Sequence, residues 1–134
     1  MRLGLVYHQF IERGGLERYL VGFARALHER GHELDVVTAK TDATTEDSPF
    51  KIHSLARPKL SSILRLWDFS WRSHAYCRDQ LNADVVLGFG RTVAQDIHRA
   101  GGGCHAVYSR LLPAAKRLGF KNRLELSLEW QLYT

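Results

Sequence analysis

The chain has 134 residues, 45% of them hydrophobic, so it is long enough for one globular domain with a core and too short for two. Its 19 Lys and Arg residues exceed its 14 Asp and Glu residues, and the net charge of +5 suits anionic ligands, anionic lipid surfaces or nucleic acid without choosing among them. Cys77 and Cys104 form no CxxC pair and follow no secretory leader, which argues against a disulfide scaffold. The apolar run of residues 3–7 is too short to cross a bilayer. We therefore expect a cytoplasmic protein, at most peripheral on the inner face of the cytoplasmic membrane.

The first 38 residues predict a strand, a helix and a second strand. Residues 3–7 are apolar without alternation, as in a strand that is buried on both faces of a parallel sheet. From Leu16 to Leu27 apolar residues recur at helical spacing, and Gly31 supplies a stop. Residues 33–38 then predict the second strand.

The rest of the chain continues the alternation of strands and helices. We expect, in chain order, a polar loop, a third strand, a long helix, a fourth strand, a short fifth strand and a last helix, over residues 40–49, 51–55, 60–81, 84–89, 95–100 and from Leu124 onward. This alternation predicts an α/β fold with a parallel, Rossmann-like sheet of order 3-2-1-4-5 flanked by helices. Ligands of such sheets gather at the carboxyl ends of the strands, where the strand order reverses. The loops after the first and fourth strands are expected to face each other there.

The long helix carries an apolar stripe with two tryptophans. Its members are Leu60, Ile63, Leu64, Trp67, Trp71 and Ala75. Such a stripe belongs to the core more often than to a ligand platform, so we expect it to pack against the sheet.

Two groups of motifs resemble a known enzyme family. Residues 14–18 (GGLER), followed by residues 30–36 (RGHELDV), resemble the opening of retaining glycosyltransferases of the two-domain GT-B type, family 4. Residues 84–89 (DVVLGF), followed by residues 96–105, resemble the bacterial subgroup that includes the lipopolysaccharide core glucosyltransferases. The two motifs in this order are considerably more specific than the first motif alone.

The resemblance implies a fold and an activity. Residues 1–134 would be a single, truncated N-terminal domain, the acceptor-side half of a GT-B fold. The enzyme would transfer a hexose from a nucleotide-sugar to a saccharide or a lipid-linked, lipopolysaccharide-like acceptor with retention of configuration. The resemblance implies no cofactor and no obligatory metal, and the histidines show no paired metal spacing. The fragment alone would be inactive, because the missing C-terminal domain holds most of the donor.

Gly14 and Gly15 are the candidate donor-phosphate site. Their backbone N–H groups and the amino end of the following helix would point at the phosphates of the nucleotide-sugar. The alternative is an ordinary turn between a strand and a helix. No G-x-G-x-x-G follows the first strand, so the fingerprint of NAD-binding proteins is missing.

Asp96 is the candidate catalytic residue. Its carboxylate, expected just past the fourth strand, would orient the attacking hydroxyl of the acceptor, and the alternative is a strand-edge or capping aspartate. His8 and Gln9 continue the first strand into the cleft and are expected to contact the acceptor. Arg91 and Thr92 would bind an anionic acceptor, although a solvated loop arginine is the commoner case.

The segment of residues 108–123 contains no acidic residue. It interleaves apolar side chains with five cations, Arg110, Lys116, Arg117, Lys121 and Arg123. This composition suits contact with an anionic membrane surface, and a solvated basic helix is the alternative.

Two further functions remain open from the sequence. The first is a non-catalytic, basic α/β module that binds phosphate ligands or nucleic acid. The second is an interaction fragment that forms a homodimer through an exposed sheet edge.

Overall fold

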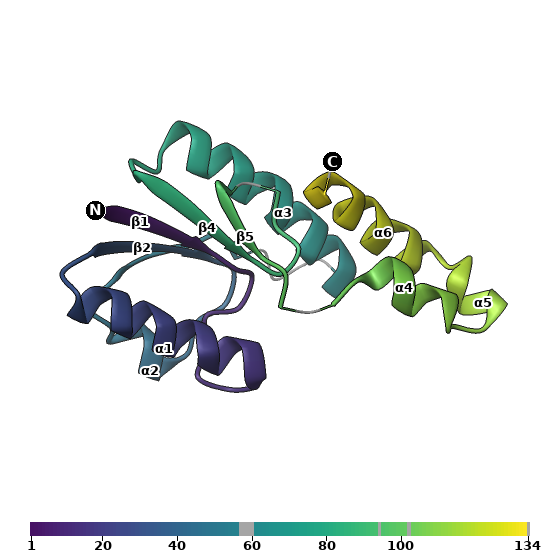
Figure 1. The fold of residues 1–134 in the computed structure, drawn as a ribbon, viewed down its shortest axis with the longest axis horizontal. Helices are drawn as coiled ribbons and strands as arrows, with labels where there is room; N and C mark the ends of the chain where they lie inside the picture. The colour runs from purple at the N-terminus through teal and green to yellow at the C-terminus, as the bar shows by residue number, and fades with distance from the viewer. Residues whose placement is uncertain (57–60, 94, 102, 134) are drawn as a thin grey trace.

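Five parallel strands form one sheet, in the order β3-β2-β1-β4-β5, in a computed structural model that describes residues 1–56, 61–93, 95–101 and 103–133 (Figure 1). The strands are β1 (Arg2–Val6), β2 (Glu33–Thr38), β3 (Lys51–Ser54), β4 (Val85–Phe89) and β5 (Ile97–Arg99). Their order and direction confirm the predicted fold class. The reversal of strand order falls at β1, which pairs with β2 on one side and with β4 on the other.

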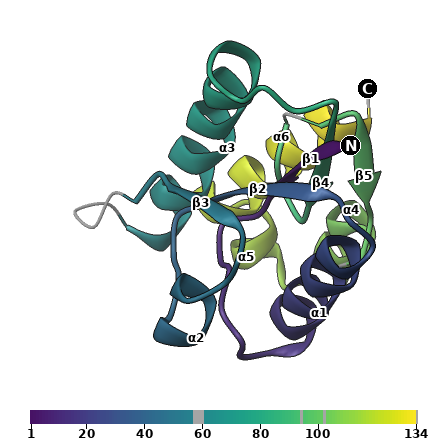
Figure 2. The ribbon, with the colours of Figure 1, turned by 90° about the vertical axis from the view of Figure 1, so that its left-hand side faces the viewer.

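Helices cover both faces of this sheet. The helices of the described residues are α1 (Gly15–Glu29), α2 (Ala43–Glu46), α3 (Ser62–Asp79), α4 (His105–Arg110), α5 (Ala114–Arg117) and α6 (Phe120–Tyr133). Figure 2 shows α1 and α2 on one face of the sheet and α3 on the other. The helices α4, α5 and α6 extend beyond the end of the sheet toward which the strands run (Figure 1).

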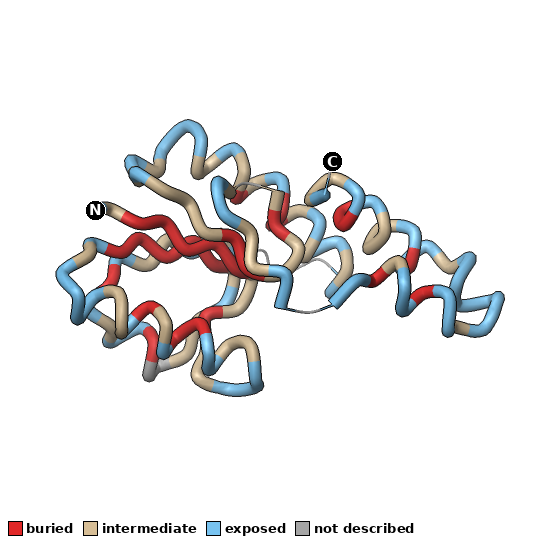
Figure 3. Tube along the Cα trace, in the orientation of Figure 1, coloured by how far each residue is buried: buried red, intermediate tan, exposed pale blue. Residues whose placement is uncertain are grey.

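The core is built around β1, as its unbroken apolar run predicts (Figure 3). Leu5 has no exposed surface and packs in one cluster with Leu20 and Ala24 of α1. Val6 points to the opposite face, where it packs with Val37 and with Phe69 of α3. Because neighbouring residues of a strand face opposite sides, β1 contributes to both layers of the core. Full burial of one such aliphatic side chain stabilises the fold by about 1.5–3 kcal/mol.

The apolar stripe of α3 faces solvent, and the predicted packing of this stripe on the sheet is wrong. Leu64, Trp67 and Trp71 are 41%, 40% and 43% exposed. The face that packs on the sheet instead carries Phe69 with the buried Ser73, whose small side chain lets the helix approach closely. Serines at helical spacing are typical of a solvated helix face, so the sequence pattern predicts the wrong face of α3 as the buried one. Leu60, the first member of the stripe, lies outside the described residues.

A buried carboxylate ties β1, β2 and β3 together. Asp35 of β2 accepts a hydrogen bond from Arg2 Nε at 2.6 Å and lies 2.7 Å from His53 Nε2. Tyr76 of α3 joins this group, with its hydroxyl 2.7 Å from His53 Nδ1. Burial alone would raise the pKa of Asp35, but the hydrogen bonds from Arg2 and His53 outweigh it and lower that pKa below its ordinary value.

The lowered pKa of Asp35 makes the stability of the fold depend on pH in the acidic range. The group stabilises the fold above the pKa of an unfolded Asp, about 4, and this contribution is lost as the pH falls through the lower, folded pKa. We expect Asp35→Asn to lower the free energy of unfolding by about 2 kcal/mol at pH 7, and the difference from wild type to shrink below pH 4. Urea denaturation at pH 7 and pH 3 measures both values. Asp79→Asn, at an exposed ion pair with Arg78, is the matched control and is expected to change little. Equal loss in the two variants would contradict the assignment.

Candidate substrate site at the carboxyl ends of the strands

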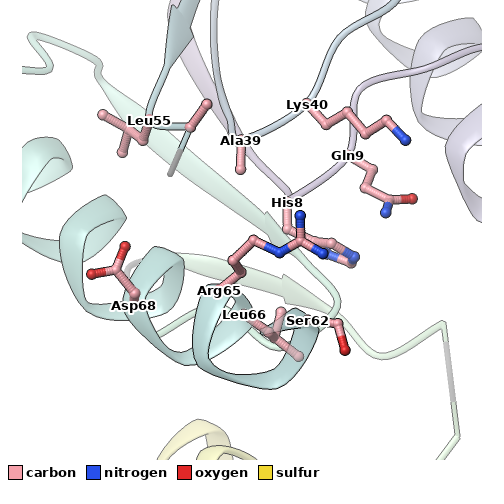
Figure 4. A pocket seen from close by; sticks show the side chains of 10 residues that line it. His8, Gln9, Ala39, Lys40, Leu55, Ser62, Arg65, Leu66 and Asp68 are labelled. Carbon is pink, nitrogen blue, oxygen red and sulfur yellow. The ribbon is translucent and has the colours of Figure 1, made fainter. Parts of the chain in front are cut away.

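Two hollows open at the carboxyl ends of the strands, and His8 lines both of them. The first hollow, about 420 Å³, lies between the ends of β1, β2 and β3 and the start of α3 (Figure 4). The second hollow, about 210 Å³, lies at the ends of β1, β4 and β5 and is bordered by α6. They therefore meet at the end of β1, where the strand order reverses, which is the place the topology favours for ligands.

His8 presents a neutral imidazole between the two hollows. Its ring packs edge-on against Tyr7, with ring centroids 4.4 Å apart, and its Nδ1 atom is buried without a hydrogen-bond partner. Burial lowers the pKa of His8, Glu17 opposes this effect, and Arg91 adds to it. A neutral imidazole that lines a hollow can bind a ligand hydroxyl through a ring nitrogen. Gln9, the next residue, lines only the first hollow.

The diglycine turn is open to solvent. Gly14 has a φ of 88°, a left-handed conformation that favours glycine, and Gly15 begins α1. Both are exposed, and a methyl group added to Gly15 would meet no neighbouring atom within 4 Å. Neither glycine lines either hollow, but Leu16, the next residue, lines the second. The turn thus borders the second hollow and not the first.

Glu17 is a residue of this region that the sequence analysis did not select. The hydroxyl of Tyr7 donates a hydrogen bond to Glu17 Oε1 at 3.4 Å, and burial together with Glu17 raises the pKa of Tyr7 to about 12. The Glu17 carboxylate also lies close to Gly14. A carboxylate in the first turn of a helix is stabilised by the helix dipole. The position of Glu17 just after the diglycine could therefore have indicated a structural role at this turn.

Arg91 is held at the wall of the second hollow by side chains from two helices. Its Nη1 atom lies 3.0 Å from Glu125 Oε1 of α6, and its Nη2 atom lies 3.1 Å from His105 Nδ1 of α4. On its other side His105 Nε2 lies 2.8 Å from Asn122 Oδ1 and 3.0 Å from Glu125 Oε2. These contacts fix the guanidinium and join the loop after β4 to α4 and α6.

His98 also lines the second hollow. Its Nδ1 atom is buried without a hydrogen-bond partner, and burial lowers its pKa.

Thr92 lies inside its loop. It is 1% exposed, and its hydroxyl donates a hydrogen bond to Gln95 Oε1 at 2.8 Å. It lines neither hollow. The structure therefore brings His8, Gln9 and Arg91 to the carboxyl edge as expected but places Thr92 beneath it.

Asp96 does not lie at the carboxyl edge, and this part of the expectation is wrong. The loop after β4 turns back, so that Asp96 comes directly before β5 and pairs with Val86, near the start of β4. Its Oδ2 atom accepts a hydrogen bond from the Val86 backbone N–H at 2.7 Å. This contact is the one expected of a strand-edge aspartate, whereas the catalytic role stays a prediction.

The five cations of the basic segment are all exposed. Arg110 ends α4, Lys116 and Arg117 lie in α5, and the other two lie in the first turn of α6. None of the five forms an ion pair with another described residue. Large exposed apolar side chains lie next to or between them in the sequence: Tyr108, Leu111, Leu118 and Phe120. Within the described ranges, no helix is long and apolar enough to span a membrane, and no three His, Cys, Asp or Glu side chains gather as metal ligands do.

A family model described as Glycosyltransferase Family 4 matches residues 13–134. The chain belongs to this family. Among solved structures it is similar to that of WaaG, a glycosyltransferase involved in lipopolysaccharide biosynthesis, with a TM-score of 0.84 at 20% identity. This match covers 96% of the chain but only 35% of WaaG, so the chain spans about a third of the length of that structure. No curated protein sequence matches the chain. Membership of family 4 and the GT-B fold agree with the resemblance seen in the sequence motifs.

The conformation of the loop after β4 requires the backbone of Gly90 to approach the ring of Tyr7 closely. Gly90 has a φ of 75°, and a methyl group there would come 2.7 Å from Tyr7 Cε2. We expect Gly90→Ala to lower the free energy of unfolding by about 2 kcal/mol, since the left-handed conformation alone costs about 1–2 kcal/mol. Gly22→Ala in α1 is the control, where open space surrounds the glycine and a gain of about 0.5–1 kcal/mol is expected. Chemical denaturation measures both, and a Gly90→Ala variant as stable as wild type would contradict the argument.

Proposed function

We propose that residues 1–134 form the acceptor-side domain of a retaining, nucleotide-sugar-dependent glycosyltransferase of family 4. The acceptor is a saccharide or a lipid-linked, lipopolysaccharide-like glycan. A second domain completes the donor-binding site. Residues 1–134 alone therefore bind substrates but do not catalyse the transfer. The observation that carries this proposal is the pair of hollows that meet at His8, beside an open diglycine turn.

The chemistry of this edge supports transfer to a hydroxyl. Two imidazoles whose pKa is lowered by burial, His8 and His98, line these hollows and suit the recognition of sugar hydroxyls. The diglycine turn adds backbone N–H groups and the amino end of α1, which suit the donor phosphates. In the transfer the acceptor oxygen bonds to the anomeric carbon, the bond to the donor phosphate breaks, and the acceptor proton passes to the leaving phosphate. No cofactor or metal enters this scheme.

A binding experiment separates this function from the nucleic-acid alternative. We expect a nucleoside diphosphate to shift the amide resonances of Gly14, Gly15 and Leu16 in NMR spectra, and a neutral disaccharide to shift those of His8 and Gln9. A random oligonucleotide at the same ionic strength is the comparison. Oligonucleotide binding that is tighter than either, and that weakens steeply with added salt, would favour a nucleic-acid module and contradict the proposal.

We also propose that the basic segment of residues 108–123 holds the domain at an anionic membrane surface. Exposed cations attract anionic headgroups, and exposed apolar side chains among them enter the interface. A lipid-linked acceptor requires its enzyme at that surface. The proposed location is the inner face of the cytoplasmic membrane.

Vesicle co-sedimentation tests this contact. A variant with Lys116, Arg117, Lys121 and Arg123 all changed to Gln lowers the net charge from +5 to +1. We expect its affinity for anionic vesicles to fall about 100-fold or more, because each cation near the surface contributes about 1 kcal/mol. The control changes Arg18, Arg30, Lys51 and Arg78 to Gln, which removes the same charge from exposed positions elsewhere. Similar losses in both variants would show a general charge effect and contradict the proposal.

A further inference from the structure

The first hollow has the dimensions and lining of a small-molecule site. Its volume, about 420 Å³, falls in the range of ligand pockets, whereas the second hollow, about 210 Å³, is smaller than that range. Leu55, Ala39 and Leu66 supply apolar surface, while polar side chains enter from three separate elements. Apolar walls with a few converging polar groups are typical of sites that bind one orientation of a ligand.

Two cations in this hollow have no partner within the part of the chain that the structure describes. Lys40 follows β2, and Arg65 lies in the first turn of α3. The side chain of neither one forms a hydrogen bond or an ion pair with any described residue. Figure 4 shows Arg65 extending from α3 toward His8, with Lys40 on the opposite wall.

The hollow contains little negative charge to offset these cations. Asp68 is the one acidic residue among the described residues that line it, and its carboxylate lies 3.3 Å from Arg72 Nη1. Arg91 at the second hollow is different, because Glu125 neutralises it. Arg99, the other cation at the second hollow, lies over the ring of Tyr19, 4.1 Å from its centroid. Lys40 and Arg65 of the first hollow have neither kind of partner among the described residues.

We propose that the first hollow binds an anionic group of the acceptor saccharide, a phosphate or a sugar carboxylate, and that Lys40 and Arg65 select for it. This inference rests on the proposed function, because it assigns the acceptor to this edge. The sugar ring lies against Leu55 and Leu66, its hydroxyls reach His8 and Gln9, and its anionic group lies between the two cations. The guanidinium of Arg65 can donate two parallel hydrogen bonds to either anion.

The donor phosphates do not account for these cations. The diglycine turn borders the second hollow through Leu16, and none of its residues lines the first. The two anions are therefore bound on opposite sides of His8. This arrangement leaves His8 beside the acceptor hydroxyl that lies nearest the donor.

NMR titration of residues 1–134 with a hexose, a hexose 6-phosphate and a hexuronate tests the inference. We expect at least one of the two anionic sugars to bind roughly tenfold more tightly than the neutral hexose, and the stronger of the two identifies the anionic group. A Lys40→Gln, Arg65→Gln variant is expected to lose this preference and to keep its affinity for the neutral hexose. Arg78→Gln, at the other end of α3 and paired with Asp79, is the control and should match wild type.

Three outcomes would overturn the inference. Equal affinity for the neutral and anionic sugars, with shifts at His8 and Gln9, would remove the anion preference and leave the proposed function intact. Inorganic phosphate or a nucleoside diphosphate that binds this hollow as tightly as the hexose 6-phosphate would show that the site binds phosphate without recognising the sugar. The absence of binding by any sugar, with tight binding of an oligonucleotide, would overturn the proposed function as well.

Discussion

The pairing of β1 between β2 and β4 is the constraint from which the rest of the molecule follows. Because β1 is buried on both faces, its length and register fix both layers of the core. His8 follows the carboxyl end of β1, so it lies where the loops after β2 and β4 diverge. The two hollows share His8 for this reason. The strand order, and not the residue type, therefore places this position at both hollows.

Much of the fold could be predicted because its signals are local. The apolar runs of β1 and β4 and the helical spacing of α1 are each complete within a few residues, and the strand order follows from their alternation. The predicted packing of the α3 stripe was wrong because hydrophobic side chains on a helix need not be buried, and the helix packs through Phe69 and Ser73. Close packing of two layers can favour a small polar side chain over a large apolar one.

The site was predictable only where it continues a strand. His8 and Gln9 extend β1 directly, so their place at the edge follows from that of the strand. Asp96 is separated from β4 by a loop that turns back, and no spacing rule reports such a reversal. The partners of Arg91 lie on α4 and α6, and Glu125 carries no motif that links it to a loop more than 30 residues earlier.

The surface position of the tryptophans has a consequence for spectroscopy. Trp67, Trp71 and Trp130 are the only three in the chain, and each is at least 40% exposed. Intrinsic fluorescence of this protein therefore reports on the outer sides of α3 and α6 and only weakly on the collapse of the core. Emission that moves to shorter wavelength without a change in folded fraction would indicate that another surface has covered one of these helices.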